Sequence, residues 1–149
     1  MASLESDFLG IKSTDPFWLA SAPTTDKGYN VRRAFEAGWG GVVWKTLGEE
    51  GPPVVNVNGP RYGAIYGADR RLMGLNNIEL ITDRSLEVNL DEITRVKKDY
   101  RNHAVIVSIM VPCEEAAWKA ILPRVEASGA DGSAVSSQHS ELHTDSADQ

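Results

Sequence analysis

Polar side chains stand at the ends of two predicted strands, where they could contact a ligand. Ser21 lies in the strand-like stretch FWLASAP, and Lys45 and Thr46 lie near the end of the β-rich stretch GVVWKTL. Ligands of α/β proteins bind at the carboxyl ends of strands. Small residues around Ser21 would let a flat ligand approach the backbone, and Lys45 could neutralise an anionic reduced flavin. The alternatives are a tight turn at Ser21 and a solvated lysine at position 45.

A third polar group lies in the stretch NNIELIT, residues 76–82. If this stretch is extended, Asn77, Glu79 and Ile81 share one face, because side chains alternate along a strand. An asparagine donates and accepts hydrogen bonds, whereas an ionised glutamate only accepts them. This pair suits a ring that alternates N–H donors with carbonyl acceptors, and uracil and thymine have such an edge. The alternative is the solvent-facing side of an edge strand.

The cysteine and the paired histidines are weaker candidates for chemistry. Cys113 is the single cysteine, with no histidine or base beside it, so we expect a small, partly buried residue and no nucleophile. His139 and His143 are four residues apart, but in a serine-rich stretch, where solvent exposure is expected and a metal site is not. The sequence therefore assigns neither a catalytic nor a metal-binding residue.

Alternating strand and helix patterns surround these candidates. A helix is predicted from an Asn30 cap to Gly38, and another where Leu86, Leu90, Ile93 and Val96 recur at helical spacing. The apolar run AVIVSIM predicts a strand buried on both faces, as in a parallel sheet. A further helix is predicted around Trp118 to Val125, with a kink or a short first turn at Pro123 and an end at Ser128-Gly129. Between the second strand and NNIELIT, the stretch VVNVN alternates like an edge hairpin strand.

These patterns predict an α/β fold, either doubly wound or a barrel, and do not choose between the two. Residues 1–132 form the predicted domain. After Gly132 the composition changes to SAVSSQHSELHTDSADQ, which has no aromatic and few apolar residues. Residues 133–149 are therefore predicted to be a disordered tail.

Composition excludes several classes of protein. The 149 residues carry a formal net charge of -6, which argues against binding to nucleic acid or to anionic membranes. No apolar run approaches the ~20 residues of a membrane span, and the first residues have no signal-peptide pattern. A single cysteine fits a reducing compartment, so the cytoplasm is the expected location.

Four stretches together resemble a known family. IKSTDPFWLASAP, RRAFEAGWGGVVWKT, LNNIELIT and SGADG, in this order, are similar to the NAD-dependent dihydropyrimidine dehydrogenases, and most similar to the bacterial subunit that contains flavin and iron–sulfur clusters. The resemblance runs from about Leu9 to Gly132, and AFEAGWG with the following WKT is its most specific part. The dihydroorotate dehydrogenases share the layout but fit these segments less well.

The resemblance implies the N-terminal part of a (β/α)8 TIM barrel that holds FMN at its C-terminal face. It implies that Ser21, Lys45 and Thr46 contact FMN, and that Asn77, Glu79 and Ile81 line the pyrimidine pocket. The family reduces uracil or thymine to the 5,6-dihydro form by hydride transfer from reduced flavin, and a cysteine on a later loop supplies a proton. Electrons come from NADH through a partner flavoprotein subunit and iron–sulfur clusters.

The sequence also departs from the family pattern after SGADG. The expected Asn-x-x-Cys-Pro-His-Gly loop is absent, Cys113 is not its counterpart, and one cysteine cannot supply the four thiolates of an iron–sulfur cluster. A typical barrel needs about 250 residues, so an incomplete barrel without turnover of its own is expected. Two other interpretations stay open, a non-catalytic α/β fragment that self-associates and a dihydroorotate dehydrogenase-like flavoenzyme.

Overall fold

The computed structural model describes residues 3–48, 62–77 and 81–135. The described elements, in chain order, are β1 (Ser6–Phe8), β2 (Ile11–Ser13), β3 (Trp18–Leu19), the 3-10 helix η1 (Pro23–Thr25), α1 (Gly28–Glu36), β4 (Gly41–Leu47), β5 (Tyr62–Tyr66), β6 (Leu72–Asn77), α2 (Leu86–Asp99), β7 (Ala104–Ile109), α3 (Glu115–Ala127) and β8 (Gly132–Val135).

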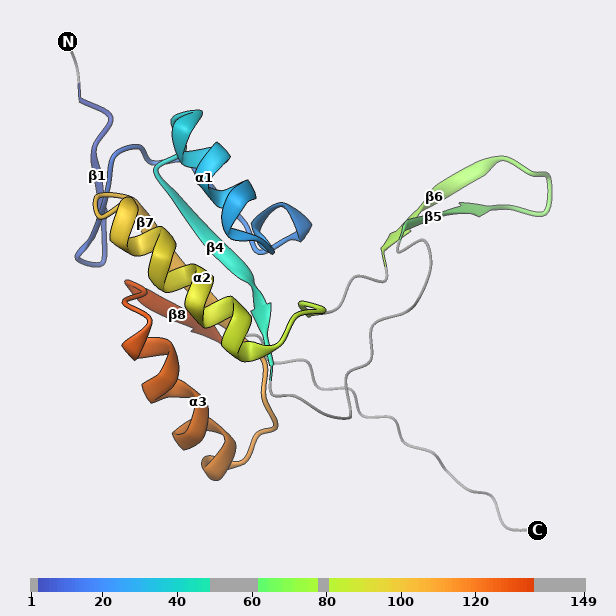
Figure 1. Ribbon diagram of the computed structural model, residues 1–149. Coiled ribbons are helices and arrows are strands. Elements are labelled where there is room, and N and C mark those ends of the chain that lie inside the picture. The colour runs from blue at the N-terminus through green and yellow to red at the C-terminus, as the bar shows by residue number, and fades with distance from the viewer. Residues whose placement is uncertain (1–2, 49–61, 78–80, 136–149) are drawn as a thin grey trace.

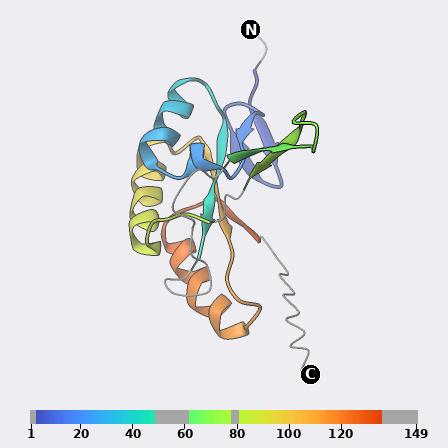
Figure 2. The same cartoon turned by 90° about the vertical axis from the view of Figure 1, so that its right-hand side faces the viewer.

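The centre of the molecule is a four-stranded parallel sheet in the order β3-β4-β7-β8. Helices α1, α2 and α3 lie on one side of this sheet, as the two perpendicular views show (Figures 1 and 2). A doubly wound sheet reverses its strand order and carries helices on both faces. The described strands instead follow one another across the sheet in chain order. The predicted α/β class is confirmed.

An apolar core fills the space between the sheet and the helices. Helix α2 contributes Leu86, Leu90, Ile93 and Val96, all buried, which confirms the amphipathic helix predicted from their spacing. The sheet contributes side chains from β4 and β7, where the predicted buried strands are also confirmed. The strands are Val-rich and nearly free of exposed residues, as expected for a covered parallel sheet.

Glycines shape the turn that leads from α1 into β4. Gly38 ends the helix with a φ of +100°, a conformation that favours glycine. Gly40 donates its N–H to the Phe17 carbonyl at 3.0 Å, and a Cβ atom at this position would overlap the Asp15 carbonyl oxygen. The motif AFEAGWG is therefore explained by close backbone approach, which brings the start of β4 beside the chain entering β3.

One helix start differs from the sequence prediction. The first helix begins at Gly28 and not after an Asn30 cap, because Glu92 accepts a hydrogen bond from the Gly28 N–H at 2.6 Å and replaces a local cap. Helix α3 runs from Glu115 to Ala127 and ends at Ser128-Gly129 as predicted, but Pro123 lies well inside it and not in a short first turn. None of the helices in the described ranges has the length and apolar character needed to cross a membrane.

Strand bounds differ from the prediction as well. In the stretch FWLASAP only Trp18 and Leu19 are paired, since the chain turns into η1 at Pro23. The stretch NNIELIT is not one strand, because β6 ends at Asn77 and Ile81 lies outside any strand. VVNVN lies outside the described residues. The hairpin that the structure does describe, β5 with β6, was not predicted, and it projects away from the sheet (Figure 1).

The predicted domain boundary after Gly132 falls inside a strand. Residues Ser133 to Val135 belong to β8, which pairs in parallel with β7 from Ile106 to Ile109. Composition did not reveal this, because the pairing satisfies backbone groups on the edge of β7 and needs few apolar side chains. The remainder of the predicted tail, residues 136–149, lies outside the described residues.

A half-buried histidine lies directly before the amino end of β7. The ring of His103 packs against Phe35 and Tyr100, with centroid distances of 4.4 and 5.6 Å. Its Nδ1 is buried and has no hydrogen-bond partner among the described residues. Burial, helped by the nearby charge of Lys97, lowers the pKa of His103 below its ordinary value of 6.5. Folding therefore favours the neutral form of this imidazole.

We predict that the chain loses stability as the pH falls through about 6.5, because the unfolded state then binds a proton that the folded His103 does not. Replacing His103 by Phe should reduce this loss and preserve the aromatic packing. The measurement is the urea midpoint at about pH 7.5 and at about pH 5.5, for both proteins. Since His139 and His143 are present in both, the difference isolates His103. Equal losses in the two proteins would contradict the assignment.

Candidate functional site

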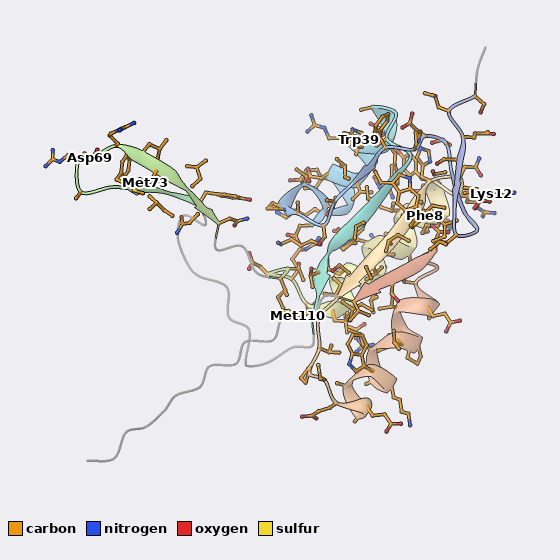
Figure 3. The ribbon with its side chains drawn as sticks, turned by 180° about the vertical axis from the view of Figure 1, so that it is seen from behind. Phe8, Lys12, Trp39, Asp69, Met73 and Met110 are labelled. Carbon is orange, nitrogen blue, oxygen red and sulfur yellow. The ribbon has the colours of Figure 1, made fainter. Side chains whose placement is uncertain are left out.

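Three hydroxyl groups from three neighbouring strands meet at the carboxyl end of the sheet. Ser21 follows β3, Thr46 is in β4, and Ser108 is in β7. The Ser21 Oγ lies 3.3 Å from the Thr46 Oγ1, which lies 2.9 Å from the Ser108 Oγ. Met110, directly after β7, lies at this end of the sheet, whereas Phe8, Lys12 and Trp39 lie at the other end (Figure 3).

This hydroxyl row runs from the surface into the sheet. Ser21 is exposed, Thr46 is half-buried and Ser108 is buried. Each hydroxyl can donate one hydrogen bond and accept others, so the row can adapt to a donor or an acceptor on a bound ring. Ser108 was missed by sequence reasoning. Its only signal was a polar residue near the carboxyl end of the otherwise apolar run AVIVSIM.

A bulge in β4 determines how Thr46 faces the site. Trp44 pairs with Val107 and Leu47 pairs with Ile109, so Lys45 and Thr46 together lie opposite Ser108 alone. Two residues against one break the usual alternation of side chains, and such bulges redirect side chains beside functional sites. Because of the bulge, Thr46 reaches Ser108 although the neighbouring Trp44 faces the helices.

Lys45 is buried, with 4% of its surface exposed. The alternative of a solvated lysine is therefore wrong. An ammonium group in a largely dry environment interacts strongly with charge nearby, because little water screens it. This arrangement suits a partner that becomes negatively charged.

The predicted pyrimidine residues are divided between two places. Ile81 is buried at the carboxyl end of β4, where its Cδ1 would lie 2.9 Å from a Cβ atom placed on Gly48. Asn77 is exposed at the end of β6, opposite Tyr62 in the projecting hairpin. Glu79 lies outside the described residues. The structure thus brings Ser21, Lys45, Thr46 and Ile81 to one end of the sheet and leaves Asn77 on the hairpin.

An ion pair supports the segment that follows Ile81. Arg84 donates two hydrogen bonds to Glu92, at 2.6 and 2.8 Å, and Glu92 also accepts from the Gly28 N–H. The hydrogen bonds from Arg84 lower the pKa of Glu92, with a further contribution from Gly28, against the opposing effect of burial. The same pairing raises the pKa of Arg84. This carboxylate joins α1, α2 and the segment before α2.

Other candidates lie away from this end or offer no site. Cys113 is exposed, so the expectation of a partly buried thiol is wrong, because the chain has left β7 and not yet entered α3. His139 and His143 lie outside the described residues. Within the described ranges, no group of three histidine, cysteine, aspartate or glutamate residues is arranged to hold a metal.

A cavity of about 790 Å³ lies at the opposite end of the sheet, beside the hairpin of β1 and β2. Its lining mixes carboxylates such as Asp7 and Asp131 with the cations Lys12 and Arg101. Asp131 already accepts hydrogen bonds from Lys97 and from the Val105 N–H at 2.8 Å each. This cavity is large, but its charges are mixed and Asp131 has a structural role. The carboxyl end of the sheet is the better candidate.

Comparison with known proteins gives a consistent set of relatives. The chloroplastic dihydropyrimidine dehydrogenase (NADP(+)) of Arabidopsis thaliana is 39% identical over 127 residues, covering 82% of this chain and 30% of the relative. The NAD-dependent dihydropyrimidine dehydrogenase subunit PreA of Escherichia coli (strain K12) is 35% identical over 128 residues, covering 86% of this chain and 30% of the relative. No family model matches. The predicted resemblance is confirmed, and the chain spans 30% of the length of these relatives.

We predict that Glu92 makes the supporting ion pair sensitive to acid. Since its folded pKa lies below the ordinary 4.5, its contribution to stability is present above that pH and is lost as the pH falls through the folded pKa. Glu92→Gln should therefore lower stability at neutral pH and weaken the acid dependence below about 4.5. Thermal unfolding followed from neutral to acid pH measures both effects. Glu126→Gln, an exposed carboxylate on α3, is the matched control. A Glu92→Gln profile identical to the wild type would exclude this role.

Proposed function

We propose that this chain forms the flavin-binding face of a dihydropyrimidine dehydrogenase, an oxidoreductase that reduces uracil or thymine to the 5,6-dihydropyrimidine. The observation that carries the proposal is the bulge in β4, which sets Lys45 and Thr46 opposite Ser108 at the carboxyl end of the sheet. The proposal is supported by relatives of that name, which are 35% and 39% identical over most of this chain.

The proposed architecture is the beginning of a (β/α)8 barrel. Support comes from the consecutive order of four parallel strands with three helices on one side (Figures 1 and 2). A typical barrel contains about 250 residues and carries its active site at the carboxyl ends of the strands. Ser21, Thr46 and Ser108 lie at that end of the described sheet.

The residues at this site fit FMN. We propose that the Lys45 ammonium balances the negative charge of the reduced flavin and that Ser21 and Thr46 orient the ring by hydrogen bonds. FMN, when bound, supplies the hydride that reduces the pyrimidine. The buried position of Lys45 strengthens its effect on a nearby charge. An iron–sulfur cluster does not fit within this chain, because its sequence contains one cysteine.

For the pyrimidine we propose recognition by Asn77, Glu79 and Ile81. The amide and carboxylate would read the donors and acceptors of the ring, and the apolar Ile81 would contact its face. Electrons would come from NADH through a partner flavoprotein subunit. We assign the proton-donating role to no residue of this chain and expect no turnover from the chain alone. NADH-dependent loss of uracil with the purified chain would refute that expectation.

A second candidate is a fragment that associates with itself. It is favoured by the apolar side chains exposed on the hairpin of β5 and β6, which include Tyr62, Leu72 and Leu75. A two-stranded hairpin alone is only marginally stable in water, so these side chains would gain from being covered. This candidate predicts oligomers that depend on protein concentration and do not need flavin.

We predict that the purified chain binds FMN at a one-to-one ratio and that Lys45→Ala weakens this binding by roughly tenfold, as expected from the loss of one charge-assisted contact. Flavin fluorescence quenching measures the affinity, and size-exclusion chromatography checks the oligomeric state. Lys119→Ala is the matched control, because Lys119 is an exposed lysine on α3. No binding, or equal weakening in both variants, would contradict the flavin site.

The ligand preference separates the proposed enzyme from a dihydroorotate dehydrogenase relative. Orotate carries a carboxylate, which the carboxylate of Glu79 would repel if both lie in one pocket. We therefore predict that the FMN-loaded chain binds uracil more tightly than orotate, measured by the change in flavin absorbance during titration. Tighter binding of orotate would favour the dihydroorotate dehydrogenase-like interpretation.

A further inference from the structure

We infer that Thr82 is a positioning residue that fixes Ile81, the proposed pyrimidine contact, relative to β4, which carries the proposed flavin residues Lys45 and Thr46. This inference rests on the proposed function. Thr82 directly follows Ile81 in the chain. It is buried, with 7% of its surface exposed, so little of it is accessible to a ligand. Its role would be to fix the position of the adjacent Ile81.

Thr82 contacts both segments that carry the candidate flavin residues. Its backbone N–H donates to the Thr46 carbonyl at 2.9 Å, which attaches the segment directly to the bulge of β4. Its hydroxyl donates to the Asp26 Oδ1 at 2.5 Å, in the loop that follows Ser21 and η1. Thr46 itself lies between the paired residues Trp44 and Leu47 of β4, so a change at Thr82 would mainly move Ile81 relative to Thr46.

The hydroxyl of Thr82 is used as an acceptor as well. It accepts from the Arg84 N–H at 3.3 Å and from the Asn89 amide nitrogen at 3.5 Å. A hydroxyl has one hydrogen to donate and two lone pairs to accept with, so these contacts use its full capacity. Valine has almost the same shape and can make none of them. Serine can make all of them, although it lacks the methyl group.

Asn89 provides a second path from this segment to β4. It is fully buried, its amide nitrogen donates to the Ser85 carbonyl at 2.9 Å, and its Oδ1 accepts from the Trp44 Nε1 at 3.1 Å. Trp44 is the residue immediately before Lys45. The segment after Ile81 is thus tied to β4 within the bulge, through Thr46, and immediately before the bulge, through Trp44.

Arg84 holds the loop that contains Asp26, the acceptor of the Thr82 hydroxyl. Its guanidinium donates to the Asp26 carbonyl at 3.1 Å while it pairs with Glu92. Asp26 is therefore held by its side chain at Thr82 and by its backbone at Arg84. A positioned acceptor loses less rotational freedom when it binds the Thr82 hydroxyl, which favours a single geometry.

The test compares Thr82→Val with Thr82→Ser in the full chain. FMN affinity is measured by fluorescence quenching, and uracil affinity is then measured on the FMN-loaded chain by flavin absorbance. We expect Thr82→Val to weaken uracil binding by about tenfold and FMN binding by less than about twofold, and Thr82→Ser to restore uracil binding. Thr94→Val is the matched control, because this exposed threonine bonds only to the Leu90 carbonyl of its own helix among the contacts described.

The outcomes separate this inference from the proposed function. Normal uracil binding by Thr82→Val, or equal weakening by the valine and serine variants, would overturn the inference and leave the proposed function standing. A wild-type chain that binds FMN but no uracil would overturn the proposed substrate, and the inference with it. If Thr82→Val does not fold, Asp26→Ala removes the same hydrogen bond by changing its half-buried partner. The inference then requires that Asp26→Ala weakens uracil binding by about tenfold and FMN binding by less than about twofold.

Discussion

The bulge in β4 is the feature on which the candidate site depends. In a regular parallel strand, side chains alternate between the faces, so Thr46 would share the helix-covered face with Trp44. The bulge sets Lys45 and Thr46 together opposite Ser108, and Thr46 bonds to that serine while Trp44 bonds to Asn89 of α2. One irregular step in the strand thus separates the core-forming residue from the two residues that we assign to flavin.

The two ends of the sheet differ in the interactions that they contain. At the amino end, the packing is structural, since Gly40 allows close backbone approach and Asp131 joins β7 to the end of α2. At the carboxyl end, the Thr46 hydroxyl lies within hydrogen-bond distance of the hydroxyls of Ser21 and Ser108. This division follows from the parallel arrangement, which collects all carboxyl ends at one edge. It also explains why part of the sequence resemblance, including AFEAGWG and SGADG, reflects the scaffold and not ligand contacts.

Local patterns predicted the elements that depend on burial, and could not predict those that depend on distant contacts. The spacing of Leu86 to Val96 identified α2, and the apolar runs identified β4 and β7. The start of α1 was mispredicted because Glu92, far away in the sequence, caps it. Ser108 and the bulge were missed because the register between two strands depends on how they pair. The periodicity of the residues within one strand does not reveal that pairing. Ser21 and Thr46 do lie together at one end of the sheet, because both stand near strand ends, and their assignment to flavin stays a prediction.

The central claim is that the carboxyl end of the sheet, and not the cavity at its amino end, is the flavin site. Backbone amide chemical shifts of the labelled chain, recorded by NMR during addition of FMN, test it directly. The account predicts that the largest changes occur at Ser21, Thr46 and Ser108. Changes concentrated at Lys12 and Arg101, beside the cavity of about 790 Å³, would contradict it.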